Sequence, residues 1–192
     1  MSTSIWGCPI PNSEELNSKL LKWIDSQPKN AGDSALGDRI SNSDYYAHFN
    51  FKDDEERIER AKKNQEYYDI LKPYFEPWYQ YIQEYYAVTH FKIDGVWFHQ
   101  YENGDQFTWH FHPESNISFV YFVELPDPSF VTEFFLVETK EVYQPPLKTG
   151  DMLVFPSYMP HRSPKITSND RKTIISGNLS LYNVNLDAIN YE

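Results

Sequence analysis

The feature that most constrains the fold is a change of pattern near residue 91. From there on, the chain shows short segments of alternating or aromatic-rich character, each bounded by turn-forming residues. The six segments are residues 96–101, 107–112, 117–124, 132–137, 152–155 and 173–181. Short strands that follow one another without helical patterns between them are typical of an antiparallel sandwich or barrel. We therefore expect a mainly β protein.

The part of the chain before residue 87 carries helical patterns instead. Asn12 or Ser13 can cap a first helix, along which leucine and isoleucine recur at helical spacing. The acidic run at residues 53–56 opens a second helix, because carboxylates near a helix N-terminus complement the helix dipole. We expect Pro73 and Pro77 to break or kink this second helix, since proline lacks the N–H that an inner turn needs.

The whole chain, residues 1–192, is expected to form one domain, with residues 1–90 as helical support for a β core over residues 91–182. The formal net charge of −11 argues against nucleic acid and anionic membranes as partners, because both require a basic surface. The single cysteine, Cys8, excludes an internal disulfide. The chain shows neither a signal-peptide pattern nor an apolar run of about 20 residues, so we expect a soluble, cytoplasmic protein.

Three of the six histidines fall at positions that suggest a metal site. His110 and His112 lie two residues apart in an expected strand, so both imidazoles point to one face, while Trp109 and Phe111 point the other way into packing. His161 follows a later strand that ends in a proline-punctuated turn. Two ligands from one strand and a third from a distant strand can hold an ion on three sides and leave positions open for other ligands.

The residues around the first two histidines resemble a known motif. The segment Tyr101-Glu-Asn-Gly104-Asp-Gln-Phe107-Thr-Trp-His110-Phe-His112 is similar to Y-x-x-G-x-x-[YF]-x-x-H-x-D, the pattern of Fe(II)- and 2-oxoglutarate-dependent oxygenases of prolyl-hydroxylase type. It matches at every fixed position except the last.

A second segment carries the same resemblance. Gly150-Asp-Met-Leu-Val-Phe-Pro156 leads to His161, and Arg171 follows ten residues later, as a basic residue follows the distal histidine in that family. The resemblance extends from about Tyr101 to Asn178 and implies a double-stranded β-helix, or jelly roll, with N-terminal helices on one face.

The resemblance also implies an activity and its cofactors. Fe(II) would be held by His110, His112 and His161, and 2-oxoglutarate and O2 would be consumed with release of succinate and CO2. The substrate would be an amino acid, a peptide or a protein that becomes hydroxylated.

Four further residues are expected to bind the cosubstrate. In the family that this chain resembles, the basic residue pairs with the far carboxylate of 2-oxoglutarate, a task that suits the planar fork of Arg171. Thr173 lies two positions on and can share that carboxylate. Tyr101 can donate its phenol to the cosubstrate, and Tyr121 is a second candidate donor.

The departure from the motif leaves the third ligand open, because His112 stands where the family has a carboxylate. Glu114 shares the parity of His112, so His112 and Glu114 could instead form an H-x-E pair. We prefer His110 with His112, because the spacing from Tyr101 fits His110 and because Pro113 disturbs the strand before Glu114.

Two alternatives from other functional classes remain at this point. The cupins share the barrel architecture, and a cupin-type protein could use three histidines without 2-oxoglutarate. The spacing of Gly104, His110 and His112, and of Gly150, Pro156 and His161, fits most of the cupin motifs. A non-catalytic barrel that only binds a ligand or partner is the third hypothesis.

Overall fold

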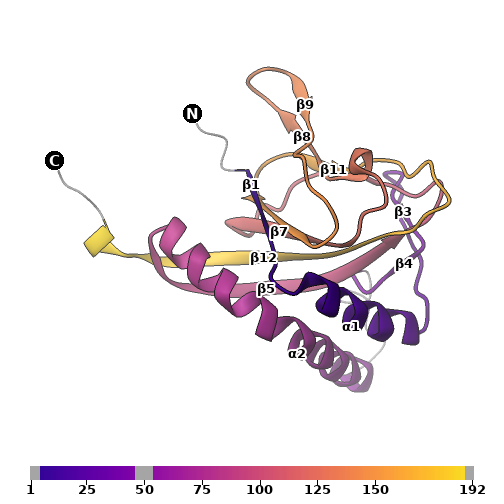
Figure 1. Ribbon diagram of the computed structural model, residues 1–192, viewed down its shortest axis with the longest axis horizontal. Coiled ribbons are helices and arrows are strands. Elements are labelled where there is room, and N and C mark those ends of the chain that lie inside the picture. Colours follow the sequence, from indigo (N-terminus) through magenta and orange to yellow (C-terminus); the bar gives the residue numbers. More distant parts are fainter. Residues whose placement is uncertain (1–4, 46–53, 189–192) are drawn as a thin grey trace.

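The computed structural model describes residues 5–45 and 54–188 as a mostly β protein with two α-helices (Figure 1). The main element is a six-stranded sheet in the order β1-β10-β7-β12-β5-β4, in which every pair of neighbours is antiparallel. Its strands are β1 (Trp6–Pro9), β4 (Asn42–Ser43), β5 (Val88–Tyr101), β7 (Ile117–Glu124), β10 (Asp151–Pro156) and β12 (Lys172–Val184).

A smaller sheet of four strands has the order β6-β11-β8-β9. Its strands are β6 (Phe107–His110), β8 (Glu133–Leu136), β9 (Glu141–Tyr143) and β11 (His161–Ser163). The short strands β2 (Gly32–Asp33) and β3 (Arg39–Ile40) pair with each other, and the 3-10 turns η2 (Pro128–Phe130) and η3 (Leu186–Ala188) complete the described elements.

Side chains alternate along β7 and so divide the interior into two cores. Phe119 and Tyr121 face the helices, where they join a core that includes residues of α1 and α2. Val120 and Phe122 face the other way, into a core that the large sheet shares with the small one. The large sheet therefore lies between a helical layer and the small sheet, and both of its faces are buried (Figure 1).

The two helices cover the outer face of the large sheet. Helix α1 (Ser13–Ser26) follows Asn12, which occupies the N-cap position in the left-handed region and makes no side-chain cap hydrogen bond. Helix α2 runs without interruption from Asp54 to Tyr85, so it contains both Pro73 and Pro77. The expected break at these prolines is therefore wrong, while the alternative of a kink stays a prediction. Residue 53, which the acidic run includes, lies outside the described residues.

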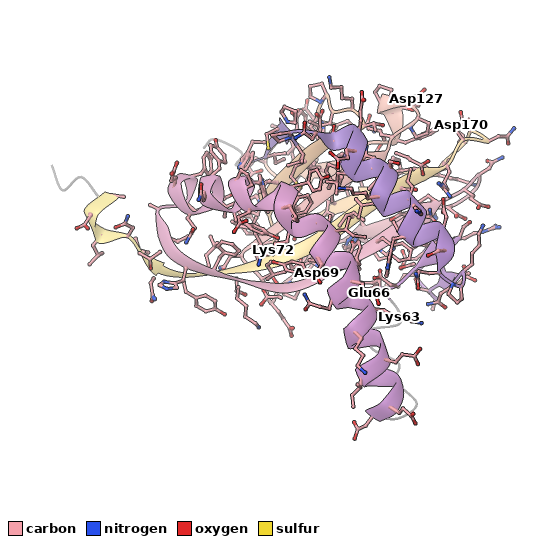
Figure 2. All side chains as sticks on the ribbon, turned by 60° about the horizontal axis from the view of Figure 1, so that its bottom comes forward. Lys63, Glu66, Asp69, Lys72, Asp127 and Asp170 are labelled. Atoms are coloured by element: carbon pink, nitrogen blue, oxygen red, sulfur yellow. The ribbon has the colours of Figure 1, made fainter. Side chains whose placement is uncertain are left out.

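Packing explains why α2 tolerates its prolines. One side of the helix buries Tyr67, Leu71, Phe75, Trp78 and Ile82 in the core against the sheet, and burial of large apolar side chains outweighs the hydrogen bonds that proline removes. The opposite side carries a charged stripe that faces solvent, formed by Lys63, Glu66, Asp69 and Lys72 (Figure 2).

All six strands expected after residue 91 are present, and β7 has the predicted bounds. β6 ends at His110 instead of residue 112, because the backbone N–H of His112 turns to the carbonyl of Ser157. Sequence patterns did not indicate β1 and β4, which come from the part of the chain before residue 90 and pair with β10 and β5. Among the described residues, the helices are too short or too polar to span a membrane.

Candidate metal centre

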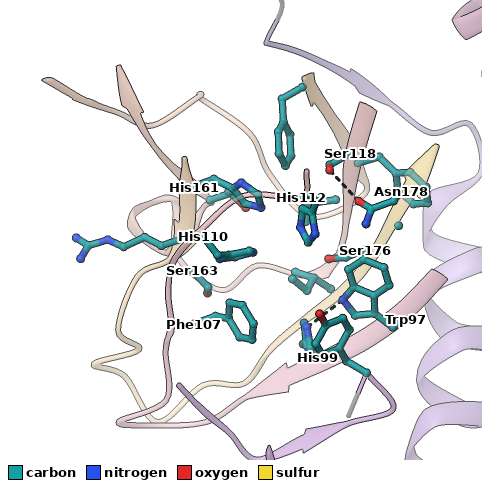
Figure 3. A pocket seen from close by; sticks show the side chains of 18 of the residues that line it. Trp97, His99, Phe107, His110, His112, Ser118, His161, Ser163, Ser176 and Asn178 are labelled. Carbon is teal, nitrogen blue, oxygen red and sulfur yellow. Dashed lines mark hydrogen bonds between the residues drawn. The ribbon is translucent and has the colours of Figure 1, made fainter. Parts of the chain in front are cut away.

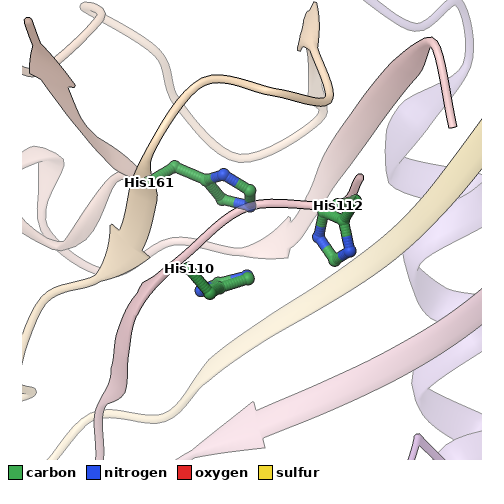
Figure 4. A group of neighbouring side chains, drawn as sticks. All are labelled: His110, His112 and His161. Atoms are coloured by element: carbon green, nitrogen blue, oxygen red, sulfur yellow. The ribbon is translucent and has the colours of Figure 1, made fainter. Parts of the chain in front are cut away.

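The small sheet brings the three predicted histidines together. β11 pairs with β6 so that His161 lies directly opposite His110, and His112 follows two residues later. The ring centroids of His110 and His161 are 4.2 Å apart, and that of His112 is 5.2 Å from His110 and 5.3 Å from His161. One ligand nitrogen from each ring lies within 4.8 Å of the other two. Figures 3 and 4 show the three rings converging on one point.

Backbone carbonyls fix which nitrogen two of these rings present. His110 Nδ1 lies 2.7 Å from the carbonyl oxygen of Thr108, and His161 Nδ1 lies 2.9 Å from that of Met159. A carbonyl can only accept, so both Nδ1 atoms carry the proton and both Nε2 atoms keep a free lone pair. This arrangement, in which the non-ligating nitrogen donates to a carbonyl, is common for histidines that bind metals.

Burial keeps the three rings neutral. Desolvation lowers the pKa of His112 to about 4, and it lowers the pKa values of His110 and His161 as well. Neutral imidazoles can accept a metal ion without first losing a proton. Three such nitrogens fit a divalent first-row transition metal, which takes imidazole readily. The chemistry of this donor set therefore supports the predicted metal site.

Strand β5 supplies the opposite wall of the cavity from its inward face. Trp97, His99 and Tyr101 all line it, as the parity of this strand predicts. Trp97 Nε1 donates to His99 Nε2 at 3.0 Å, and His99 Nδ1 lies 2.8 Å from Ser43 Oγ. Because Nε2 accepts, the Nδ1 of a neutral His99 carries the proton and donates to Ser43. Burial lowers the pKa of His99 to about 3, so this ring is a fixed neutral part of the wall.

A buried lysine that contacts two cavity-lining residues, Ser163 and Tyr101, was not identified from the sequence. Lys172, the first residue of β12, has no exposed surface, and its Nζ donates to Ser163 Oγ at 2.8 Å. The ammonium also lies 5.2 Å from the centre of the Tyr101 ring. Among the described residues, Lys172 forms no ion pair with a carboxylate. Desolvation lowers its pKa to about 7, and the negative charge of Glu133, which itself pairs with Arg162, offsets this shift only in part.

Arg171 lies on the other face of the large sheet. Its Nη1 donates to Asp25 of α1 at 2.8 Å, and its Nε donates to Glu124 at 2.8 Å. Thr173 also donates to Glu124 through its hydroxyl. The structure therefore does not bring Arg171 and Thr173 to the histidines, because alternation along β12 turns these two side chains toward the helices and Lys172 inward.

Tyr121 and Glu114 are also placed away from the three rings. The Tyr121 hydroxyl donates to Asn17 of α1 at 2.6 Å, on the helical side of the large sheet. Glu114 is exposed and is not part of the group whose ligand atoms converge. Tyr101 is the one predicted cosubstrate residue that lines the cavity.

Two aromatic residues next to the histidines differ from expectation. Trp109 and Phe111 do point away from the site, but they are 39% and 57% exposed and so do not enter a core. The Trp109 ring is covered in part by the guanidinium of Arg162, 4.7 Å from its centre. Within residues 5–45 and 54–188, both rings are left partly open to solvent, which the sequence pattern did not reveal.

The arrangement of elements is similar to that of several known enzymes, although neither protein-family models nor curated proteins match the sequence. A prolyl-4-hydroxylase from Pseudomonas putida is 12% identical, with a TM-score of 0.54 and 93% of each chain covered. An oxidoreductase of the 2OG-Fe(II) oxygenase family from Burkholderia pseudomallei is 10% identical, with a TM-score of 0.62 over 94% of this chain and 85% of that one.

A third similar structure is a prolyl hydroxylase from Trichoplax adhaerens in complex with a peptide fragment of the hypoxia-inducible factor oxygen degradation domain. It is 12% identical, with a TM-score of 0.54 over 98% of this chain and 89% of that one. At such identities the likeness establishes a shared fold. The three proteins are two prolyl hydroxylases and a member of the 2OG-Fe(II) oxygenase family, the superfamily that the sequence motifs resemble.

Proposed function

We propose that this protein is an Fe(II)- and 2-oxoglutarate-dependent dioxygenase that hydroxylates an amino-acid, peptide or protein substrate. Its two facing sheets would then form the double-stranded β-helix of a jelly roll, in one domain. The observation that carries the proposal is the pairing of two features in one interior, three neutral histidines and a buried lysine without a carboxylate partner.

The two features meet on strand β11. Ser163, which accepts from Lys172, lies two residues after His161 on β11, so their α-carbons are separated by roughly 6.6 Å along the strand. One carboxylate of 2-oxoglutarate can pair with the ammonium of Lys172 while the keto-acid end reaches the metal. A charged hydrogen bond of this kind would give the buried lysine the direct carboxylate partner that it lacks among the described residues.

Each residue of the site has a defined task in this proposal. His110, His112 and His161 hold Fe(II), and Lys172 and Ser163 orient the cosubstrate, with Tyr101 packed beside the ammonium. When bound, Fe(II), 2-oxoglutarate and O2 supply the oxidising chemistry, in which 2-oxoglutarate becomes succinate and CO2 and a C–H group of the substrate becomes C–OH. Aromatic walls exclude water from the reacting groups.

The three-histidine set has a consequence for charge. A protein carboxylate would cancel part of the charge of Fe(II), whereas three neutral imidazoles cancel none. The dianion 2-oxoglutarate carries two negative charges, one for the metal end and one for Lys172. We therefore expect iron and 2-oxoglutarate to bind cooperatively, each more tightly when the other is present.

Anaerobic calorimetric titration tests the proposal. Titration of 2-oxoglutarate into the Fe(II)-loaded protein should show one site, which Lys172→Met removes and the matched variant Arg171→Met retains. Iron binding without 2-oxoglutarate binding would favour the cupin-type alternative. A chain that binds neither would be a non-catalytic barrel.

A further inference from the structure

A wide groove lies next to the cavity at the three histidines. Its volume is about 1350 Å³, and it is formed by α2, β5, β12 and the loop that follows β6. Trp97, His112 and Asn178 line both this groove and the cavity at the histidines, so the two spaces adjoin each other. Cavities for small ligands usually measure about 300–1,000 Å³, so this groove has room for a larger molecule.

Several ring side chains line this groove, which we call the aromatic groove. They come from elements far apart in the sequence: Tyr67, Tyr68, Phe91, Trp97, Phe111 and Tyr182. Phe111 is 57% exposed and Tyr182 is 48% exposed, although both are large apolar side chains. These exposed rings border a concave surface next to the candidate site. Apolar parts of a ligand can pack against such rings.

Two carboxylates line the aromatic groove, and within the described part of the chain only one of them, Asp94, is in an ion pair. Asp94 is held by an ion pair with Lys92 at 3.2 Å and by the hydroxyls of Ser115 and Ser180. Glu114 is exposed and has no ion pair or side-chain hydrogen bond among the residues that the structure describes. A ligand in the groove therefore meets one unpaired negative charge, two residues along the chain from His112.

A polar group at the inner end of the groove is oriented by its neighbours. Ser118 donates to Asn178 Oδ1 at 2.8 Å and lies 2.9 Å from Ser157 Oγ (Figure 3). A hydroxyl has one proton, so Ser157 must be the donor to Ser118. Because Oδ1 is fixed as the acceptor, the NH2 group of Asn178 remains as a donor for a ligand where the groove joins the cavity.

We propose that the substrate is a peptide segment with a basic side chain, bound along the aromatic groove. This inference rests on the proposed oxygenase function for its chemical outcome. Asn178 donates to a backbone carbonyl next to the carbon that reacts, the rings cover apolar side chains, and Glu114 attracts the basic group. A peptide combines these three requirements, because it repeats carbonyl acceptors along a chain that can fill a long groove.

Binding of two matched fluorescent probes tests this inference without turnover. N-acetyl-lysine 2-naphthylamide and N-acetyl-glutamate 2-naphthylamide share an aromatic ring and amide carbonyls but differ in charge. Titrated into the full chain at low salt, the lysine probe should bind about fivefold more tightly, as expected for an exposed charge pair. Glu114→Gln should abolish this preference, whereas the control Glu138→Gln, at an exposed glutamate outside the groove, should leave it unchanged.

Two further variants test the walls and the inner end. Phe111→Ala and Asn178→Ala should each weaken both probes about fivefold, since each removes one contact worth roughly 1 kcal/mol. Thermal unfolding of the variants shows whether they fold. Where Asn178→Ala fails to fold, the exposed Phe111 gives the same information for the groove.

The inference would be overturned by equal affinity for the two probes, by no binding of either, or by a preference that survives Glu114→Gln. Probe binding needs neither iron nor 2-oxoglutarate. If the inference about the groove is wrong, the probes do not bind while 2-oxoglutarate still does. If the proposed oxygenase function is wrong, the probes bind while 2-oxoglutarate does not.

Discussion

Arg171 and Lys172 are adjacent cations in the chain, yet the structure gives them opposite surroundings. Arg171 is partly exposed on the helical side of the large sheet, where it bridges Asp25 of α1 and Glu124 of β7. Lys172 is fully buried between the two sheets, with Ser163 as its hydrogen-bond acceptor. Strand alternation therefore separates a cation in direct ion pairs from a neighbouring cation that has none among the described residues.

Under the proposed function, this difference separates a structural charge, Arg171, from a ligand-binding one, Lys172. A paired surface cation contributes little to stability and is satisfied without a ligand. A buried cation without an anion destabilises the empty protein, so its presence is best explained by a ligand that brings the missing charge. Four predictions test the contrast between Arg171 and Lys172 and the metal site beside it, from the largest expected effect to the smallest.

Removal of a metal ligand should have the largest effect. His161→Ala and His110→Ala should each weaken Fe(II) binding more than about 100-fold, because two imidazoles remain and the coordination geometry is lost. Glu114→Ala, at an exposed position, should leave iron binding unchanged. Metal content after anaerobic loading and desalting measures this. Loss of iron from Glu114→Ala as complete as that from His110→Ala would favour the H-x-E assignment.

The contrast between Arg171 and Lys172 should be most direct in their effects on 2-oxoglutarate affinity. Lys172→Met should weaken 2-oxoglutarate binding about 100-fold, since it removes one partner of a buried charged hydrogen bond. Arg171→Met should change that affinity less than twofold. Anaerobic calorimetry on the iron-loaded variants measures both. An effect of Arg171→Met larger than that of Lys172→Met would reverse our assignment and restore the prediction from the sequence.

Cosubstrate affinity should also depend on pH. The pKa of Lys172 is about 7 in the empty protein, and only its protonated form pairs with a carboxylate. As pH rises from 7 to 8 the charged fraction falls from about one half to about one tenth, so 2-oxoglutarate affinity should fall about fivefold. Calorimetry at the two pH values should show this fall together with proton uptake on binding at pH 8. Lys172→Met should lack the pH dependence.

Stability without ligands should change in opposite directions at the two positions. Lys172→Met should raise the free energy of unfolding at pH 7 by about 1 kcal/mol, because it removes an unpaired buried charge. Arg171→Met should lower it by about 1 kcal/mol or less, because Arg171 is partly exposed and its ion pairs are screened. Urea denaturation of the metal-free protein measures both, and a loss of stability in Lys172→Met would contradict the interpretation of Lys172 as a charge awaiting a ligand.

Much of the candidate site could be predicted from sequence because its residues follow simple periodicities. His110 and His112 are two residues apart, and Trp97, His99 and Tyr101 share one face of β5. β7 was bounded correctly because its apolar run lies between clear turn residues. The class of fold followed from the succession of short strands.

Lys172 could not be found in the same way. β12 is buried on both faces over its first six residues, so its polarity does not alternate and its inward face cannot be read from the sequence. The motif places the basic residue ten positions after His161, which selects Arg171 instead of Lys172 as the partner of 2-oxoglutarate. Similarly, Pro73 and Pro77 predict a break in α2 locally, and only packing against the sheet, a long-range effect, explains the continuous helix.

Turnover of 2-oxoglutarate tests the central claim most directly. Succinate should form when the protein is incubated with Fe(II), 2-oxoglutarate, O2 and a reductant, at a rate that Lys172→Met and His161→Ala abolish and Arg171→Met retains. The absence of succinate from the wild-type protein loaded with iron, or its formation at an unchanged rate by Lys172→Met, would contradict the account.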